Sequence, residues 1–514
     1  MKKKRTIKSK PMHVIEFAIT EVENYAHPRD AFNKRFFNMW IIHNIVVKEA
    51  QRRLTALMDN KLYRALRQKY HRLKQQSEKD PELKELAALM SRMQGEYRLS
   101  KYDLGKYAKV CGRKYRNTLS SQQVQKEADR VWKGVESVLY GNGKHLHLCK
   151  LNEFMSISQK SATNGIKADL TSGHCIWNGL RFEAHIDWRD PYVADALLAD
   201  VSYFEVKRRM FESGWRYYLV VVLQGSPPKK INDIKRKSAT PGGIDSSPST
   251  LAYVSEKKAI LTRLAPYSEE YGKRIRHLQK ENDRLLRNIN AENYNPDGSV
   301  RKGRHKWNSS SRIRKNRRLI KTLYRKKAEY IRQSHYELVN QIVSDCSELY
   351  LEPMHYKALQ KRSSRTERSE KTCTVQKKDG TVIAVHKYKK KKRFGKSIGD
   401  HAPAEMIALL KQRCEQYHVP VHETNCRTMK ASQYNPLTGE YESSDLNIRI
   451  KKIGKHNVQR DLLSAYITAN ADETLTYPDP ERCLSHWEQF LRVHDKEISR
   501  MKAEGISFKS CFGF

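Results

Sequence analysis

The chain has 514 residues and a formal net charge of +42, from 99 Lys and Arg against 57 Asp and Glu. This charge repels cationic partners and attracts polyanions, so nucleic acid is the expected partner and an anionic membrane surface is the alternative. No apolar run approaches the ~20 residues of a membrane-spanning helix, and the first residues lack the apolar stretch of a signal peptide. Nine cysteines without a Cys-x-x-Cys pair argue against a disulfide framework. We therefore expect no membrane contact and a cytoplasmic or nucleoid-associated location.

The first part of the chain changes its hydrophobic period twice. Residues 1–27 contain an alternating stretch that predicts a strand, and residues 28–144 have a helical period. We expect Asp30 to cap the first of these helices and Ser121 to cap the last. Residues 145–228 return to period two with Asn-Gly turn signals, which predicts a small barrel or sandwich. The first strand is expected to join it, so the helices would be an insertion into a β domain.

The second part of the chain is predicted to be an α/β domain. Residues 229–241 form a basic linker, and in residues 242–514 strand patterns alternate with helical ones. A long charged helical pair is expected as an insertion at 266–345, and a basic insert at 360–400. The last helical segment is expected to begin near Asn457.

Three carboxylates interrupt segments of this region that are otherwise apolar or neutral. We expect Asp245 near the start of a strand, in a glycine-rich approach that admits metal or substrate. Glu352 ends an apolar strand before Pro353 and is expected at a sheet edge, and Asp461 lies in the first turns of a helix. Taken singly, they have ordinary alternatives as a turn residue, a solvated strand end and a partner of Arg460. Together, in a basic chain, they predict a nuclease site with two Mg²⁺ ions roughly 4 Å apart, in which Mn²⁺ could substitute.

The segments around these acids also carry a family resemblance. Residues 242–252 (GGIDSSPSTLA) resemble the first RuvC-type nuclease motif of transposon-encoded TnpB proteins and of the related type V CRISPR effectors. Residues 348–352 (ELYLE) resemble the second motif, and residues 458–466 (VQRDLLSAY) the third. The resemblance implies a split RuvC (RNase H-like) domain after an N-terminal β-barrel, or wedge domain, interrupted by a helical recognition lobe.

The same resemblance implies an activity and its partners. The family member would be a prokaryotic, RNA-guided DNA endonuclease with Mg²⁺ held by Asp245, Glu352 and Asp461. Guide RNA and target DNA would be its partners, in a transposase or CRISPR-array context, and the protein would read a short flanking motif. An RNA-independent RuvC-like nuclease or transposase, and a guided DNA-binding protein without cleavage, stay open. So does the oligomeric state.

The chain departs from the family in its cysteines. Many TnpB proteins carry a zinc ribbon of paired Cys-x-x-Cys between the second and third motifs, whereas residues 353–457 hold three cysteines without such a pair. An alternative set has a ligand at every fourth residue: Cys414, His418, His422 and Cys426. Pro420 would break the helix that this spacing needs, so core or surface roles are expected and zinc is doubtful. The missing ribbon predicts a divergent branch, intermediate between transposon and CRISPR systems.

Two basic segments are expected to bind nucleic acid. The first is a phosphate-tracking loop after a predicted hairpin, for which a solvated or nuclear-localisation-like run is the alternative. Its residues are Lys389, Lys390, Lys391, Lys392, Arg393 and Lys396. The second is the outer face of the helical pair, which could hold an A-form duplex by its backbone while the inner face packs the pair together. Its residues include Arg312, Arg314, Arg317 and Arg318.

Overall fold

The computed structural model describes residues 11–76, 81–141, 143–228, 240–361, 367–376, 382–388, 394–443, 445, 448–506 and 512–513. The chain divides into two compact units, Met1–Asp233 and Ile234–Phe514, and each is described by itself. Among the described helices, none has the length and apolar character to cross a bilayer.

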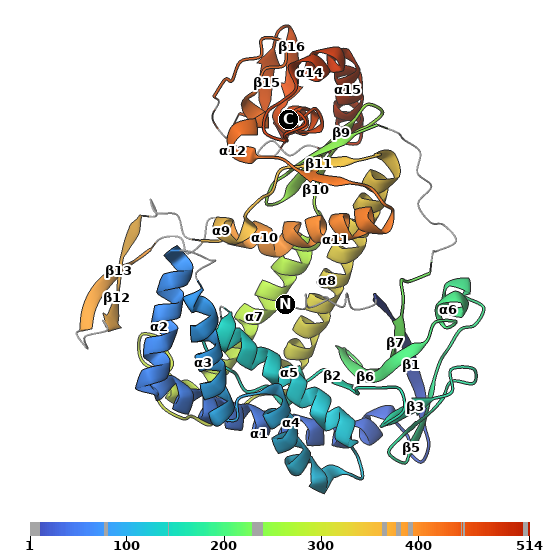
Figure 1. The fold of residues 1–514 in the computed structure, drawn as a ribbon, viewed down its shortest axis with the longest axis vertical. Helices are drawn as coiled ribbons and strands as arrows, with labels where there is room; N and C mark the ends of the chain where they lie inside the picture. Colours follow the sequence, from blue (N-terminus) through green and yellow to red (C-terminus); the bar gives the residue numbers. More distant parts are fainter. Residues whose placement is uncertain are drawn as a thin grey trace. The chain divides into compact units, whose positions relative to one another are not determined.

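The first unit contains one seven-stranded sheet in the order β2-β6-β7-β1-β5-β4-β3 (Figure 1). Its strands are β1 (Met12–Val22), β2 (Ser156–Ser158), β3 (Ile166–Ala168), β4 (His174–Trp177), β5 (Leu180–Ala184), β6 (Val201–Phe211) and β7 (Gly214–Gln224). β1 pairs first with β7 and then with β5, with a bulge between Ile19 and Glu21. Because a bulge bends its strand, the sheet curls into a half-barrel with β2 and β3 at its ends, which agrees in part with the predicted small barrel or sandwich.

All but one of the α-helices described in the first unit lie between β1 and β2 in the chain. They are α1 (Pro28–Asp59), α2 (Lys61–Gln76), α3 (Glu82–Glu96), α4 (Lys101–Gly112) and α5 (Ser121–Tyr140), followed later by the short α6 (Pro191–Ala196). Phe32 of α1 is fully buried, and its ring stacks on Tyr217 of the sheet at 4.9 Å. Both predicted caps are wrong: Asp30 lies inside the first turn of α1, and Ser120, not Ser121, caps α5.

The second unit is built on a five-stranded sheet in the order β10-β9-β8-β11-β14. The strands are β8 (Gly242–Ser246), β9 (Thr250–Ser255), β10 (Ala259–Arg263), β11 (Leu349–Leu351) and β14 (Val421–Glu423). β8, β9 and β10 are antiparallel, whereas β11 runs parallel to both β8 and β14. Ile244 and Tyr253 belong to a core with α8 and α11, while Ala252 and Val254 belong to a second core with α13 and α15. Helices therefore cover both faces of this sheet.

The remaining elements of the second unit follow in chain order. They are α7 (Ser268–Ile289), α8 (Ser311–Asp345), α9 (Tyr356–Leu359), β12 (Arg368–Gln376), β13 (Val382–Tyr388), α10 (Gly395–His401), α11 (Pro403–Gln416), α12 (Cys426–Met429), β15 (Ile450–Ile453), β16 (His456–Gln459), α13 (Arg460–Ala469), α14 (Pro480–Ser485) and α15 (Trp487–Ala503). The predicted charged helical pair is confirmed as α7 and α8. The predicted helix start near Asn457 is wrong, because a hairpin turning at Gly454, with φ +56°, makes this residue part of β16.

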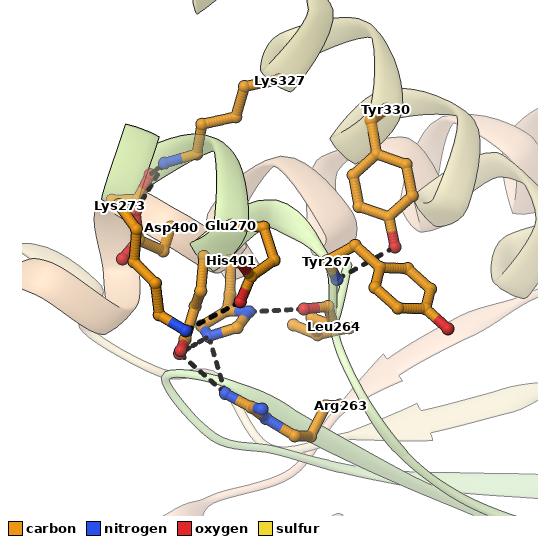
Figure 2. A network of polar contacts seen from close by, with 11 residues as sticks. Arg263, Leu264, Tyr267, Glu270, Lys273, Lys327, Tyr330, Asp400 and His401 are labelled. Carbon is orange, nitrogen blue, oxygen red and sulfur yellow. Dashed lines mark hydrogen bonds and ion pairs between the residues drawn. The ribbon is translucent and has the colours of Figure 1, made fainter. Parts of the chain in front are cut away.

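A buried polar network joins α10 to α8 and to the turn after β10 (Figure 2). Lys327 of α8 donates a hydrogen bond to Asp400 at 2.5 Å, and the two side chains are 11% and 8% exposed. His401 is fully buried and contacts the carbonyl oxygen of Leu264 at 2.5 Å and the carboxylate of Glu269 at 3.2 Å. This network fixes the end of α10 that lies away from the basic segment.

Candidate active site

Asp245 and Glu352 come from two neighbouring parallel strands. Asp245 is the fourth of the five residues of β8, and β11 ends at Leu351, whose ladder partner is Ile244. Continuing this register brings Glu352 beside Asp245, on strands ~4.8 Å apart. Asp245 thus lies near the end of its strand rather than the predicted start. The sheet edge predicted for Glu352 is also wrong, because it follows an inner strand.

Gly243 lets α13 lie directly on β8. A Cβ atom on this glycine would fall 2.0 Å from the backbone oxygen of Ala465 and 2.6 Å from the backbone nitrogen of Ala469. The glycine-rich approach predicted to admit metal or substrate therefore admits a helix at this position. The close approach carries Asp461 and Ser464, which lie one turn apart on α13, toward the end of β8.

The three acids are electrostatically linked. Burial raises the pKa of the Asp245 carboxyl well above its ordinary value, and the negative charges of Asp461 and Glu352 raise that pKa further. A hydrogen bond from Ser464 and the positive charge of Arg460 act in the opposite direction on the pKa of Asp245. Burial also raises the pKa of Glu352. Carboxylates from three distant parts of the sequence therefore lie near one another, with Asp245 and Glu352 half-buried, and their combined negative charge would favour a cation.

Asp461 is held by two guanidinium groups. It is 4% exposed, and Arg449 Nη1 lies 3.3 Å from its Oδ1 and 3.4 Å from its Oδ2. Arg460 Nη2 lies 3.3 Å from the same Oδ1, while its Nη1 donates to the carbonyl oxygen of Ile448 at 3.2 Å. The ordinary alternative for Asp461, a partnership with Arg460, is thus also present in the structure.

The three carboxylates have the right chemistry to hold a metal ion, but they are not arranged as a complete set of ligands. Carboxylate oxygens are the ligands that Mg²⁺ prefers, and the charges of Asp461 and Glu352 both act on Asp245. Yet within the described parts of the chain, no group of three or more His, Cys, Asp or Glu residues could hold an ion. Both carboxylate oxygens of Asp461 are directed to Arg449. The set of three metal ligands therefore stays a prediction.

Three residues of this site were not predicted from the sequence. Ser464 follows Asp461 by three residues on a helix, and this spacing was the available signal. We expected metal or substrate beside Gly243, whereas α13 lies there. For Arg449 the signal lay in hairpin register: Arg460 N donates to Arg449 O at 2.8 Å, directly beyond the Ile450 pair of the β15–β16 ladder.

Only part of the two predicted basic segments lies within the described residues. The predicted loop residues 389–393 lie outside the described residues, whereas Lys396 is exposed on α10. The hairpin predicted before the loop is confirmed as β12 and β13. On α8, the four predicted arginines are exposed, and Arg312 forms an ion pair with Glu281 at 2.5 Å. The other three are Arg314, Arg317 and Arg318.

The four spaced Cys and His residues do not form a metal site. Cys414 is buried in the core under β8 and β11, and Cys426 is exposed. His422 contacts Glu348 at 3.0 Å, and His418 follows α11 with a φ of +55°. Cys414 is thus a core residue, Cys426 and His418 lie at the surface, and His422 is half-buried, while the doubt about zinc stays a prediction.

Comparisons with known proteins give little guidance. No protein-family model matches the sequence, and no curated protein matches it. Among solved structures, one match is titled "Cryo-EM structure of the Cas12f1-sgRNA-target DNA complex", with TM-score 0.44, 12% identity, and coverage of 90% of this chain and 99% of that one. A second, "Cryo-EM structure of CRISPR-Cas12f Ternary Complex", has TM-score 0.27 and 12% identity, covering 89% of this chain and 99% of the other. Such weak likeness defines no shared activity.

Proposed function

We propose that this protein is an RNA-guided, Mg²⁺-dependent DNA endonuclease whose metal ligands are Asp245, Glu352 and Asp461. The observation that supports this most is geometric: the parallel register of β8 and β11 brings Glu352 beside Asp245, and α13, which carries Asp461, packs directly on β8 at Gly243. The segments that carry the three acids are also the ones that resemble the RuvC-type motifs of TnpB proteins and type V CRISPR effectors.

In this proposal the chain prepares a site for divalent cations. Bound Mg²⁺ would supply Lewis-acid chemistry for phosphodiester hydrolysis. Asp245 is oriented by Ser464, and Gly243 keeps α13 against the strand that carries Asp245. Arg449 neutralises the buried carboxylate of Asp461 while no metal is bound. Guide RNA and target DNA are the proposed partners, supported by the net charge of +42 and by the exposed arginines of α8.

A second candidate function is guided DNA binding without cleavage. The observation that favours it is the pairing of Asp461 with Arg449 and Arg460, together with the lack of a three-ligand group in the described regions. If the guanidinium groups stay on Asp461 in the complex, the site cannot gather its metals.

Plasmid cleavage separates these functions. The full chain is expressed with its flanking non-coding locus, copurified RNA is sequenced, and cleavage is measured with Mg²⁺ on plasmids carrying the matching target. We expect RNA-dependent cleavage that is lost in Asp245→Ala and kept in Asp283→Ala, which removes an exposed acid from α7. Equal cleavage by RNA-free protein would refute guidance. Target binding without cleavage by the unmodified protein would establish the second candidate.

A further inference from the structure

The second unit contains a groove of about 970 Å³ that is separate from the carboxylate site. It runs along β10, which is the end strand of the five-stranded sheet, and is walled by α8 and α15. Its lining combines aromatic rings with an excess of positive charge. The basic residues are Lys257, Lys258, Arg263, Lys496 and Arg500, and the acidic ones are Glu337, Asp345 and Glu497. None of the three acids of the candidate active site lines it.

Lysines line this groove without forming ion pairs in the described structure. Lys257 and Lys258 precede β10, and Lys496 lies on α15. None of the three has an ion-pair partner among the described residues, whereas both arginines of the lining are paired with carboxylates. Arg263 pairs with Glu269 at 2.7 Å, for example.

Two acids of the lining also lack an ion-pair partner in the described structure: Asp345 accepts hydrogen bonds from the Tyr253 and Ser255 hydroxyls, and Glu337 accepts one from Gln333. The groove therefore offers three unpaired lysine ammonium groups to a ligand, against the two carboxylates of Glu337 and Asp345.

An aromatic pair lies beyond the other end of β10. The ring of Tyr267 is next to that of Tyr330, with centroids 6.1 Å apart (Figure 2). The backbone N–H of Tyr267 donates to the Tyr330 hydroxyl at 3.2 Å, which holds the pair together. Tyr267 is nevertheless 69% exposed. An exposed ring on a fixed backbone is the kind of surface on which nucleic-acid bases stack.

The edge of β10 is closed to a peptide strand. The backbone N–H of Leu261, which points away from the sheet, donates to the carboxylate of Glu497 at 2.9 Å. Arg500 holds that carboxylate with two hydrogen bonds of 2.8 Å. Since β-strand addition needs free backbone groups along the edge, this arrangement disfavours a peptide and leaves the side-chain chemistry to select the ligand.

We propose that this groove binds a single-stranded segment of nucleic acid, with phosphates at Lys257, Lys258 and Lys496 and a base stacked on Tyr267. The five residues of β10 span about 17 Å at ~3.4 Å each. That length accommodates a few nucleotides of a single strand. A duplex has its bases paired and offers no face to the tyrosine. The inference rests on the proposed function only in taking nucleic acid as the ligand.

Binding without metal tests the groove independently of cleavage. The full chain, freed of RNA and kept in EDTA, is titrated with fluorescein-labelled oligouridine, oligothymidine or a DNA duplex, and anisotropy is recorded. We expect Tyr267→Ala to weaken single-strand binding about tenfold and duplex binding less than twofold. Tyr102→Ala, which removes another tyrosine that is 69% exposed, is the matched control and should change neither. Comparing the affinities for oligouridine and oligothymidine shows whether the groove prefers RNA or DNA.

The lysines are tested by salt dependence. Replacing Lys257, Lys258 and Lys496 together by Ala should lower the slope of log K against log salt by about 2, at ~0.7 per phosphate contact on a single strand. The control removes three exposed lysines of the first unit: Lys84, Lys109 and Lys133. Equal slope changes in both triple variants, unchanged affinity in Tyr267→Ala, or equal loss for the duplex would each overturn the proposal. All of these outcomes can be measured even if the protein shows no guided cleavage, because the binding assays do not depend on cleavage.

Discussion

Replacing Asp245 by Asn should stabilise the metal-free protein while it abolishes cleavage. The pKa of the Asp245 carboxyl is raised in the folded chain by burial and by the charges of Asp461 and Glu352. An acid whose folded pKa is above its unfolded value of ~3.9 loses stability as pH rises between these two values. The loss is complete above the folded pKa and absent below the unfolded one. Asparagine has the same shape as aspartate but carries no charge, so Asp245→Asn avoids this loss of stability.

The size of this effect follows from the strand geometry. Asp245 and Glu352 lie on neighbouring strands ~4.8 Å apart, and two unit charges at that distance repel by about 3 kcal/mol at an effective dielectric constant near 20. The Ser464 hydrogen bond and the charge of Arg460 offset part of this repulsion. We therefore expect Asp245→Asn to gain about 1–2 kcal/mol of unfolding free energy, which corresponds to a Tm rise of about 2–6 °C.

Calorimetry in EDTA across the pH range checks this prediction. The stability difference between Asp245→Asn and wild type should be largest at alkaline pH and vanish as the pH falls to about 4. Asp283→Asn, an exposed position on α7, should show no such pH-dependent difference. Added Mg²⁺ or Mn²⁺ should raise the Tm of wild type more than that of the variant, because a ligand that binds only the folded state stabilises it. A variant that is no more stable than wild type at alkaline pH would refute the electrostatic coupling.

Three further changes test other parts of the second unit. Gly243→Ala should cost about 1–3 kcal/mol or more and reduce cleavage, because its Cβ would fall 2.0 Å from a backbone oxygen of α13; urea unfolding measures this. Arg449→Gln should lower stability in EDTA by about 1–3 kcal/mol and tighten Mn²⁺ binding measured by calorimetry, since guanidinium and metal compete for Asp461. Lys327→Met should cost about 3–5 kcal/mol in urea unfolding, because it leaves Asp400 buried without its partner.

Each of these variants has a matched control. Gly399→Ala adds a methyl group where nothing lies within 4 Å, so it should not destabilise the protein. Arg492→Gln removes an exposed arginine from α15 and should leave Mn²⁺ affinity unchanged. Combining Lys327→Met with Asp400→Asn should restore most of the lost stability. If the double variant is as unstable as the single one, packing rather than charge explains the loss.

The fold was predictable where one local period dominates. The strand at β1 and the helices from α1 to α5 follow from alternation that changes at residue 28. How far the sheet curls toward a barrel was not predictable, because it depends on how the two ends of the sheet are placed. The bulge between Ile19 and Glu21, which directs β1 to two different partners, leaves no mark in the hydrophobic pattern. The cap at Ser120 was missed by one residue because two serines are adjacent there.

The candidate site was predictable in its acids and not in their surroundings. Asp245, Glu352 and Asp461 each interrupt an apolar segment beside the end of an element, and such charges are seen in the sequence alone. What surrounds them depends on contacts between distant segments. The approach of α13 to Gly243 needs the sheet and the helix in place, and so does the hydrogen bond of Ser464 to Asp245.

The β15–β16 hairpin controls the charge balance of the site. Its ladder pairs Ile450 with Gln459, so the next residues outward, Arg449 and Arg460, lie side by side and both reach Asp461. A carboxylate that is 4% exposed needs compensation, and the two guanidinium groups provide it in the absence of metal. If a divalent cation took the place of the arginines at Asp461, as the proposed function requires, both guanidinium groups would be released, and guanidinium binds phosphate in a bidentate manner. In that proposal the arginines that neutralise Asp461 without metal would bind the substrate backbone when metal is bound.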